Sequence, residues 1–184
     1  MINLLHVRMA FGDKRIFDDL SLSFSSPGQY AILGPSGRGK TTLLRLIAGL
    51  ERPQGGQIVM PADTRISFCF QEDRLLPFKT IRENVALVCG SDETAQRWLE
   101  RVGLGSEGDG YPASLSGGMK RRAALARALA FDAPVLLMDE PFRALDADTH
   151  ADMLALVREA AKDKLLILVT HDEADAKGMQ VIAL

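Results

Sequence analysis

The run from Gly34 to Thr41 constrains the fold most, because it fits the pattern G-x-x-x-x-G-K-[ST] at every fixed position. A compact apolar segment, residues 30–33, precedes it and is typical of a strand buried on both faces. The residues after it carry an apolar face at helical spacing: Leu43, Leu44, Ile47 and Leu50. Glycines let backbone N–H groups turn inward, and a helix N-terminus adds partial positive charge. The sequence therefore predicts a strand, a phosphate-binding loop and a helix, with Lys40 reaching the β- and γ-phosphates.

Further apolar segments predict the rest of an α/β fold. Residues 4–9 and 20–24 look like strands joined by short turns, which favours antiparallel pairing. Two apolar runs, 135–138 and 165–170, flank a helical pattern at 152–161. A strand, a helix and a strand in this order indicate a parallel sheet with right-handed crossovers. We expect a mostly parallel core sheet flanked by helices, with an N-terminal antiparallel β subdomain.

Residues 72–128 have a different pattern, which predicts an inserted α-helical lobe. Residues 81–88 and 93–102 have helical spacing, and 119–130 are rich in the strong helix formers Ala, Leu and Arg. We therefore expect one domain over 1–184, in which a nucleotide-binding core with the β subdomain (1–71 and 129–184) carries this lobe (72–128).

Composition excludes several classes of protein. The 184 residues are 47% hydrophobic and 25% charged, with a net charge of −2, so disorder and a general affinity for nucleic acid or anionic membranes are not expected. Cys69 and Cys89 form no metal-binding pair and suggest a reduced, cytosolic protein. We see no signal peptide, and the apolar runs are too short to span a bilayer. A membrane role would therefore need a partner.

Two carboxylates close the apolar run at 135–138. Asp139 ends this strand at the edge where ligands bind in open α/β sheets, so it is the expected Mg²⁺ partner together with the Thr41 hydroxyl. Glu140 is the expected general base for attack on the γ-phosphate. Acidic residues also cap strand ends, and the phosphate loop is what favours the catalytic interpretation.

A second glycine cluster, residues 115–119, precedes the Ala- and Arg-rich helix. Ser116 would cap this helix, and Gly117 and Gly118 would leave N–H groups open to an anion. One phosphate group needs only one such set of backbone N–H donors, so the second set could bind the nucleotide of another subunit. The alternative is a helix cap with permissive glycines.

With these motifs in this order, the chain resembles the ATP-binding cassette (ABC) ATPases over nearly its whole length. The resemblance implies an ATP-hydrolysing subunit with ATP and Mg²⁺ as cofactors. It makes residues 34–42 the Walker A loop and implies that these residues bind nucleotide: Gly34, Pro35, Ser36, Gly37, Arg38, Gly39, Lys40, Thr41 and Thr42. It likewise makes Ser116, Gly117, Gly118 and Met119 the signature that binds the partner's nucleotide in trans.

The resemblance assigns further single residues. Gln71 becomes the Q-loop glutamine, which contacts Mg²⁺ and water, and His171 the switch histidine at the γ-phosphate; both join Glu140 in catalysis. Asp146 becomes the D-loop aspartate at the dimer contact, and Phe11 the aromatic that stacks on adenine. Each has a plainer alternative: a polar strand-end residue, a cap after a strand, a helix N-cap and a core side chain, respectively.

The chain departs from the family pattern in a few places. Met119 replaces a glutamine, a variant that suits importers, and Arg143 replaces a small residue before the D-loop. Arg121 replaces a residue that is commonly polar and uncharged. The basic run 120–122 is either a solvated helix face or electrostatic support for the second phosphate site. The chain ends soon after His171, so we expect a terminal strand and helix to be missing or reduced.

The resemblance implies a homodimer, or paired cassettes, that closes around two ATP molecules and drives a permease for a small solute. A solute-binding protein would act through the permease, and the subunit would be cytoplasmic, on the inner face of the membrane. Residues 72–78, with Leu75, Leu76 and Phe78, are the candidate docking groove, or an ordinary loop with core side chains. The motifs faintly resemble the nitrate, sulfonate and taurine importers. The alternatives are a soluble ABC-type ATPase acting on nucleic acid or the ribosome, and a regulatory cassette with weak turnover.

Overall fold

A computed structural model describes all of residues 1–184, and the chain divides into two compact units. Unit 1 comprises Met1–Ile66, Pro134–Asp139 and Lys162–Leu184, and unit 2 comprises Ser67–Ala133 and Glu140–Ala161. These two units are defined by which residues pack together, and they do not test the predicted boundaries of the helical lobe at 72 and 128. Those boundaries stay a prediction. No helix has both the length and the apolar character needed to cross a membrane.

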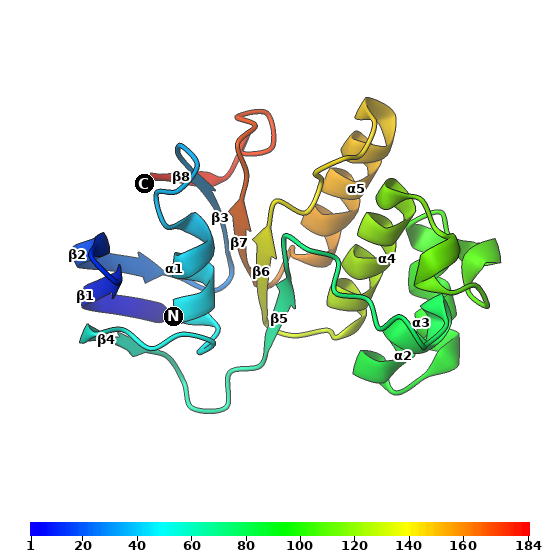
Figure 1. Ribbon diagram of the computed structural model, residues 1–184, viewed down its shortest axis with the longest axis horizontal. Coiled ribbons are helices and arrows are strands. Elements are labelled where there is room, and N and C mark those ends of the chain that lie inside the picture. The colour runs from blue at the N-terminus through cyan, green and yellow to red at the C-terminus, as the bar shows by residue number, and fades with distance from the viewer. The chain divides into compact units, whose positions relative to one another are not determined.

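Unit 1 contains a three-stranded antiparallel sheet in the order β2-β1-β4 (Figure 1). Its strands are β1 (Ile2–Phe11), β2 (Lys14–Phe24) and β4 (Gly55–Val59). Strand β1 pairs antiparallel with both neighbours and buries the apolar side chains of Ile2, Leu4, Val7 and Met9, and the alternation shifts by one residue at the irregularity between Leu4 and Val7. The antiparallel subdomain expected from the sequence is confirmed.

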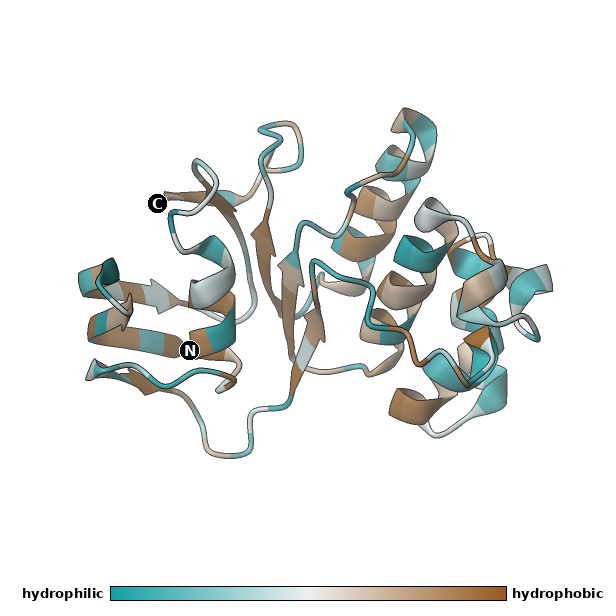
Figure 2. Ribbon diagram, viewed as in Figure 1, coloured by the Kyte–Doolittle hydropathy of each residue, from teal (hydrophilic) through white to brown (hydrophobic).

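The parallel sheet of unit 1 runs in the order β6-β7-β3-β8. These strands are β6 (Val135–Asp139), β7 (Leu165–Val169), β3 (Gly28–Leu33) and β8 (Gln180–Ala183), and their pairs are parallel. Every residue of β6 and β7 is buried, and Figure 2 shows β7 as a continuous hydrophobic strand. Helix α1 (Lys40–Ile47) contacts β6 and β7 and buries Leu43, Leu44 and Ile47 of the predicted apolar face. Leu50, the fourth residue of that face, lies beyond the end of the helix and is exposed. The α/β fold is therefore confirmed.

Unit 2 is mainly helical, with α2 (Ile81–Cys89), α3 (Asp92–Arg101), α4 (Gly117–Ala130) and α5 (Ala147–Ala160). Strand β5 (Ile66–Cys69) carries the chain from unit 1 into unit 2, and the short turns η1 (Gly105–Glu107) and η2 (Pro112–Ser114) link α3 to α4. Helices α2, α3 and α4 contact one another, and α4 also contacts α5. Each helix begins at a side chain that accepts a backbone N–H bond: Thr80, Ser91, Ser116 and Asp146. These caps set where the helices start.

Candidate functional site

The phosphate loop joins β3 to α1 in unit 1. Gly37 and Gly39 have φ angles of 79° and 94°, in the left-handed region that favours glycine. Gly39 is the N-cap of α1 and supplies no side-chain cap, and the first turn of α1 carries no acidic residue. A Cβ on Gly39 would lie 2.5 Å from Ile16 Cγ2 and 2.9 Å from Phe17 Cζ. The side chains of β2 therefore pack directly under the loop and leave the helix N-terminus open to an anion.

Lys40 turns its ammonium group back over this loop. The side chain is 8% exposed, and Nζ donates to the carbonyl oxygens of Gly34 at 2.6 Å and Pro35 at 2.9 Å. Both acceptors are main-chain carbonyl oxygens of the loop, and neither is a carboxylate. A flexible ammonium group in this position can transfer its bonds to phosphate oxygens.

The carboxyl edge of the parallel sheet gathers the predicted residues of unit 1. Val169 of β7 is in register with Asp139 on one side and with Ile32 on the other. Adjacent strands lie about 4.8 Å apart, so Asp139 lies roughly 10 Å across the sheet from Ile32, just before the phosphate loop. His171 follows β7 by two residues at the same edge. The geometry therefore brings the phosphate loop, Asp139 and His171 to one edge.

A buried pair fixes the turn that carries His171. Thr170 and Asp175 are 4% and 2% exposed, and the Thr170 hydroxyl donates to Asp175 Oδ2 at 2.7 Å. The same hydroxyl oxygen accepts from the Asp172 backbone N–H at 3.1 Å. His171 itself is exposed. The turn is thus rigid at its base while the imidazole faces solvent.

The β1–β2 turn adds one expected and one unexpected residue. Phe11 ends β1 and is 48% exposed, so the alternative that it is a core side chain is wrong, and adenine stacking stays a prediction. Lys14 opens β2, and its Nζ lies 3.8 Å from the position that a Cβ would take on Gly37. Lys14 is thus a second cation beside the loop, which the sequence pattern did not predict. Its only signal was a charged turn residue close to Phe11.

The residues of unit 1 suit a hard divalent cation. Thr41 lies in the first turn of α1, and Asp139 ends β6 with only 2% exposure. A hydroxyl and a carboxylate are oxygen donors of the kind Mg²⁺ takes alongside nucleotide phosphates and water. The donor set therefore fits Mg²⁺.

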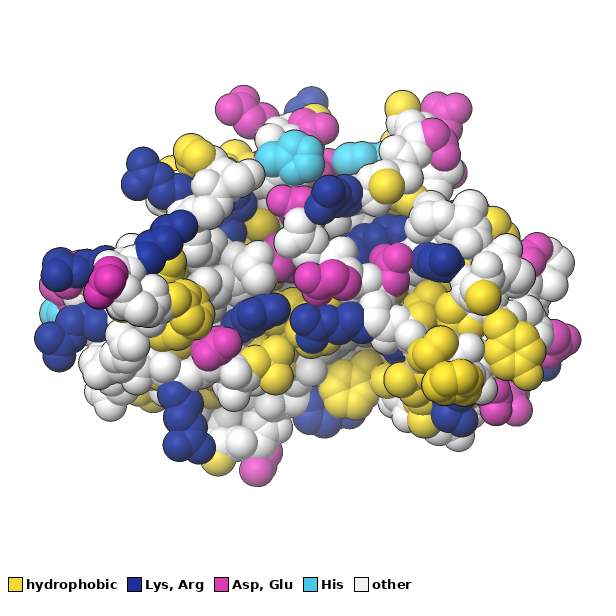
Figure 3. All heavy atoms as spheres, in the orientation of Figure 1, with side chains coloured by type: hydrophobic (Ala, Val, Ile, Leu, Met, Phe, Trp, Pro, Cys, Tyr) yellow, Lys and Arg dark blue, Asp and Glu magenta, His cyan; other side chains and the backbone are white.

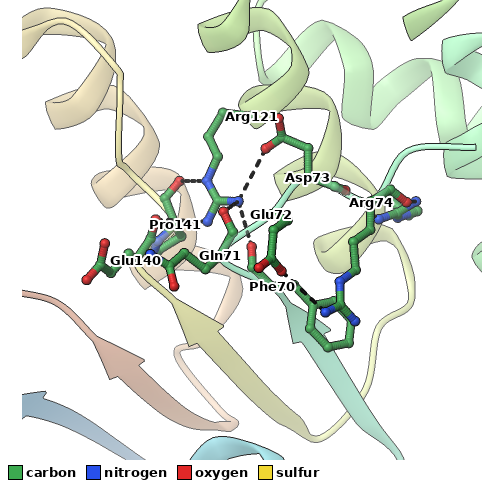
Figure 4. Close-up of polar contacts among 9 residues, drawn as sticks. Phe70, Gln71, Glu72, Asp73, Arg74, Arg121, Glu140 and Pro141 are labelled. Atoms are coloured by element: carbon green, nitrogen blue, oxygen red, sulfur yellow. Dashed lines mark hydrogen bonds and ion pairs between the residues drawn. The ribbon is translucent and has the colours of Figure 1, made fainter. Parts of the chain in front are cut away.

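Unit 2 places the two remaining catalytic candidates around one arginine (Figure 4). Glu140 has a φ of 47°, and its carbonyl oxygen accepts from Arg121 Nη2 at 2.8 Å. The carbonyl oxygen of Gln71 accepts from Arg121 Nη1 at 3.3 Å. Arg121 is 3% exposed, so the interpretation of a solvated helix face is wrong for this residue. The main chains of Gln71 and Glu140 thus share a buried partner.

The signature segment forms the start of α4. The Ser116 hydroxyl accepts from the Met119 backbone N–H at 3.2 Å, so the capping interpretation is confirmed. Ser116 and Gly117 are exposed, and a Cβ on Gly117 would meet nothing within 4 Å. A Cβ on Gly118 would lie 3.5 Å from the Ala144 carbonyl oxygen. The start of α4 is therefore open on one side and lies against the D-loop segment on the other; its role as a second anion site stays a prediction.

Asp146 is the N-cap of α5, as the plainer alternative proposed. Its Oδ1 accepts from the Thr149 backbone N–H at 3.0 Å, and its Oδ2 accepts from the Thr149 hydroxyl at 2.9 Å. The backbone N–H of Thr149 chiefly lowers the pKa of Asp146, with help from the hydroxyl. Its contact across a dimer stays a prediction.

The segment 72–78 presents hydrophobic side chains to solvent. Phe78 is 93% exposed and Leu76 is 44% exposed, so these two side chains are not core residues. Figure 3 shows hydrophobic side chains gathered over the helices of unit 2, where Leu87 and Tyr111 are also exposed. An exposed apolar group of this kind marks a candidate interaction surface.

The chain matches known proteins in both sequence and structure. The family model described as "ABC transporter" matches residues 17–143. The chain is 46% identical over 182 residues to "Aliphatic sulfonates import ATP-binding protein SsuB 3" of Paraburkholderia xenovorans, covering 95% of this chain and 72% of that protein. It is 41% identical over 181 residues to the protein of the same name in Rhodococcus jostii, covering 95% and 67%.

Solved structures agree with the sequence matches. A dimeric post-hydrolysis state of the ATP-binding cassette MJ0796, bound to ADP and Pi, superposes with a TM-score of 0.90 at 29% identity, covering 100% of this chain and 94% of that one. An ATP-bound bacterial Atm1-family ABC exporter gives 0.89 at 26% identity, covering 100% and 36%. The phosphate loop, the carboxylate at the strand end and the signature helix thus occur together in a chain that belongs to the ABC transporter family, as an ATP-binding cassette with ATPase activity.

Proposed function

We propose that this chain is the ATP-hydrolysing subunit of an importer for aliphatic sulfonates. One observation carries the nucleotide site: the phosphate loop, Asp139 and His171 meet at the carboxyl edge of one parallel sheet. The cargo rests on the names of the relatives, which are 41% and 46% identical and are aliphatic sulfonate import proteins.

The residues divide the chemistry as follows. The open N-terminus of α1 and Lys40 bind the phosphates, and Phe11 stacks on adenine. Thr41 and Asp139 would hold Mg²⁺, with Gln71 as the further ligand that the family resemblance implies, and the ion would supply positive charge to neutralise the phosphates. Glu140 accepts a proton from the attacking water, and His171 holds the γ-phosphate in place. Hydrolysis thus needs Glu140 in a fixed position next to bound ATP.

Two copies of the chain would complete two sites. Ser116 and Gly117 are exposed at the start of α4, and this open face supports a role in binding the nucleotide of a second copy. A two-fold axis would make the two composite sites equivalent. Asp146 and the segment before it would contact the partner, because Ala144 lies beside Gly118.

The membrane partner would bind the exposed segment 72–78. Its apolar residues Leu76 and Phe78 are available to a permease, and Gln71 directly precedes the segment. The permease would place the subunit on the cytoplasmic face of the membrane and would receive the sulfonate from a solute-binding protein.

The catalytic assignment is tested with Glu140→Gln. The amide has nearly the shape of the carboxylate but cannot accept the proton, so we expect normal ATP binding, loss of hydrolysis and an ATP-dependent dimer in size-exclusion chromatography. Glu93→Gln, an exposed acid in the first turn of α3, is the control and should hydrolyse ATP normally. Equal turnover in Glu140→Gln and the wild type would refute the role of Glu140.

The composite site is tested with Gly117→Arg and Ser116→Arg. A side chain at Gly117 meets open space in the single chain and leaves the Ser116 cap intact, so Gly117→Arg should bind ATP as a monomer and fail to dimerise. Ser116→Arg should also block dimerisation. Dimers formed by Gly117→Arg with ATP would exclude this face from the interface.

The cargo is tested by transport. Vesicles that contain the subunit with its permease and solute-binding protein should take up a radiolabelled alkanesulfonate when ATP is supplied, and nitrate should not compete. Competition by nitrate would point to another member of the importer subgroup.

A further inference from the structure

Arg121 lies in the second turn of α4, facing inward, where a charged side chain is unexpected. It is 3% exposed, and its three nitrogen atoms together reach five residues in two chain segments. Buried guanidinium groups are costly unless every donor finds an acceptor. The hydrogen bonds of Arg121 therefore show which main-chain segments this buried side chain holds in place.

The first set of bonds holds the segment that contains Gln71. Nη1 donates to the carbonyl oxygens of Phe70 at 2.6 Å and Gln71 at 3.3 Å, and to Asp73 Oδ1 at 3.3 Å. Figure 4 shows these acceptors on one side of the guanidinium group. The Asp73 carboxylate also supplies the negative charge that the buried cation needs.

The second set of bonds holds the turn that begins at Glu140. Nε donates to the Pro141 carbonyl oxygen at 2.8 Å, and Nη2 donates to the Glu140 carbonyl oxygen at 2.8 Å. Glu140 has a left-handed backbone with a φ of 47°, a conformation that a non-glycine residue keeps only when its surroundings hold it. The bond from Nη2 is one of the contacts that hold it.

One rigid group therefore connects two segments that are about 70 residues apart in the chain. Folding brings these two segments together. The guanidinium group is planar, and its donors have fixed directions, so a bond to one segment sets the position of the other. A lysine keeps the charge but presents three donors from one nitrogen, and methionine presents none. Of these three side chains, only arginine can hold both segments at once.

We propose that Arg121 is a positioning residue for hydrolysis, which fixes the main chain of Glu140 relative to that of Gln71. This inference rests on the proposed roles of Glu140 and Gln71. The donors of Arg121 bind main-chain carbonyl oxygens and the Asp73 carboxylate, so it acts through the main chain, by keeping the Glu140 carboxylate where it accepts the proton. Movement of the segment after Gln71 would also reach Glu140 through this side chain.

Arg127 offers a matched control on the same helix. Its Nη1 donates to the Arg74 carbonyl oxygen at 2.8 Å and its Nη2 to the Asp73 carbonyl oxygen at 2.9 Å. Arg127 thus anchors residues 73–74, in the segment that follows Gln71. Neither of these two bonds reaches the turn at Glu140. A general loosening of the segment should appear in both arginine variants, but loss of positioning at Glu140 only in those of Arg121.

The test compares Arg121→Met, Arg121→Lys and Arg127→Met in steady-state ATP hydrolysis. Misplacement of a reacting group costs up to about 100-fold in rate, so we expect kcat to fall roughly 10- to 100-fold in Arg121→Met and less in Arg121→Lys. The KM for ATP should stay within about twofold, because the phosphate loop is untouched. Arg127→Met should keep kcat near the wild-type value.

Hydrogen exchange supplies the second readout. The amides of Glu140, Phe142 and Arg143 should exchange faster in Arg121→Lys than in Arg127→Met, which a purely local effect on α4 would not produce. If Arg121→Met does not fold, the lysine variant decides on the same criteria. Wild-type kcat in Arg121→Lys with unchanged exchange at 140–143, or an equal fall in kcat in Arg127→Met, would overturn the proposal.

Glu140→Gln, measured in parallel, separates the two proposals. If Glu140→Gln is inactive and the Arg121 variants are fully active, the positioning role alone fails. If Glu140→Gln hydrolyses ATP normally, the catalytic role of Glu140 fails, and with it the basis of the inference.

Discussion

Two glycines of the phosphate loop have similar backbones but different surroundings, and this difference makes a quantitative prediction. Gly37 and Gly39 have φ angles of 79° and 94°. A Cβ on Gly37 would meet only Lys14 Nζ, at 3.8 Å, which is ordinary contact. A Cβ on Gly39 would lie 2.5 Å from Ile16 and 2.9 Å from Phe17. Gly37→Ala thus introduces backbone strain alone, whereas Gly39→Ala adds a clash with the side chains of Ile16 and Phe17.

The magnitudes follow from these two contributions. A left-handed backbone costs a residue with a Cβ roughly 1–2 kcal/mol, and this applies to both variants. Forcing an extra methyl group into a packed site adds about 1–3 kcal/mol in Gly39→Ala only. For a chain of this size, 1 kcal/mol shifts Tm by about 2–4 °C. We expect Tm to fall by roughly 2–8 °C in Gly37→Ala and roughly 4–20 °C in Gly39→Ala.

The assay is thermal unfolding followed by circular dichroism, with no nucleotide present. Removing nucleotide matters, because ligand binding would add its own stabilisation to each Tm. Phe17→Leu combined with Gly39→Ala gives a further check. Leucine lacks the ring atoms that the new Cβ would meet, so the double variant should recover part of the lost Tm. Equal Tm values for the two alanine variants would refute the packing of β2 side chains under Gly39.

Three further predictions concern binding and capping. Saturating ATP at 100 times its Kd should raise Tm by about 5–11 °C, and Lys40→Met should lose most of this rise. Ser116→Ala should cost about 1 kcal/mol and Ser116→Asn much less, because asparagine also caps helices; chemical denaturation measures both. The folded-state pKa of Asp146 lies below its ordinary 3.8, so its cap stabilises the fold above that pH and is lost as pH falls through the folded-state pKa. Tm should therefore fall less between neutral and acidic pH in Asp146→Asn than in the wild type, because the asparagine side chain does not titrate.

Strands with strong apolar patterns were predicted from the sequence, and strands without them were not. β6 and β7 are buried along their whole length, so their hydrophobic runs identify them. β4 begins with two glycines, and β8 has three exposed residues among its four. Such strands form because a neighbour offers backbone hydrogen bonds, and a single sequence does not show that neighbour. Helix α5 begins five residues before the predicted range, because the Asp146 side chain caps the helix there.

The sites divide in the same way. The phosphate loop, Asp139 and the signature are local patterns, in which neighbouring residues make the chemistry, so the sequence alone predicts them. Arg121 and Lys14 depend on contacts between distant segments. Spacing along α4 indicates only that Arg121 is a basic residue on a helix. Its bonds to the Gln71 and Glu140 segments exist only in the folded chain.

Asp139 and Glu140 show how two adjacent carboxylates acquire different roles. Asp139 is the last residue of β6 and is 2% exposed, so the strand fixes its carboxylate at the sheet edge. The φ of 47° at Glu140 ends the strand at once, and the chain turns so that Arg143 N–H and Arg121 both donate to the Glu140 carbonyl oxygen. This conformation costs roughly 1–2 kcal/mol, and two hydrogen bonds, one of them from a charged group, are of the size needed to offset it. The backbone at Glu140 is therefore held by contacts rather than by its own preference, and the rate of hydrolysis should depend on the residues that make those contacts.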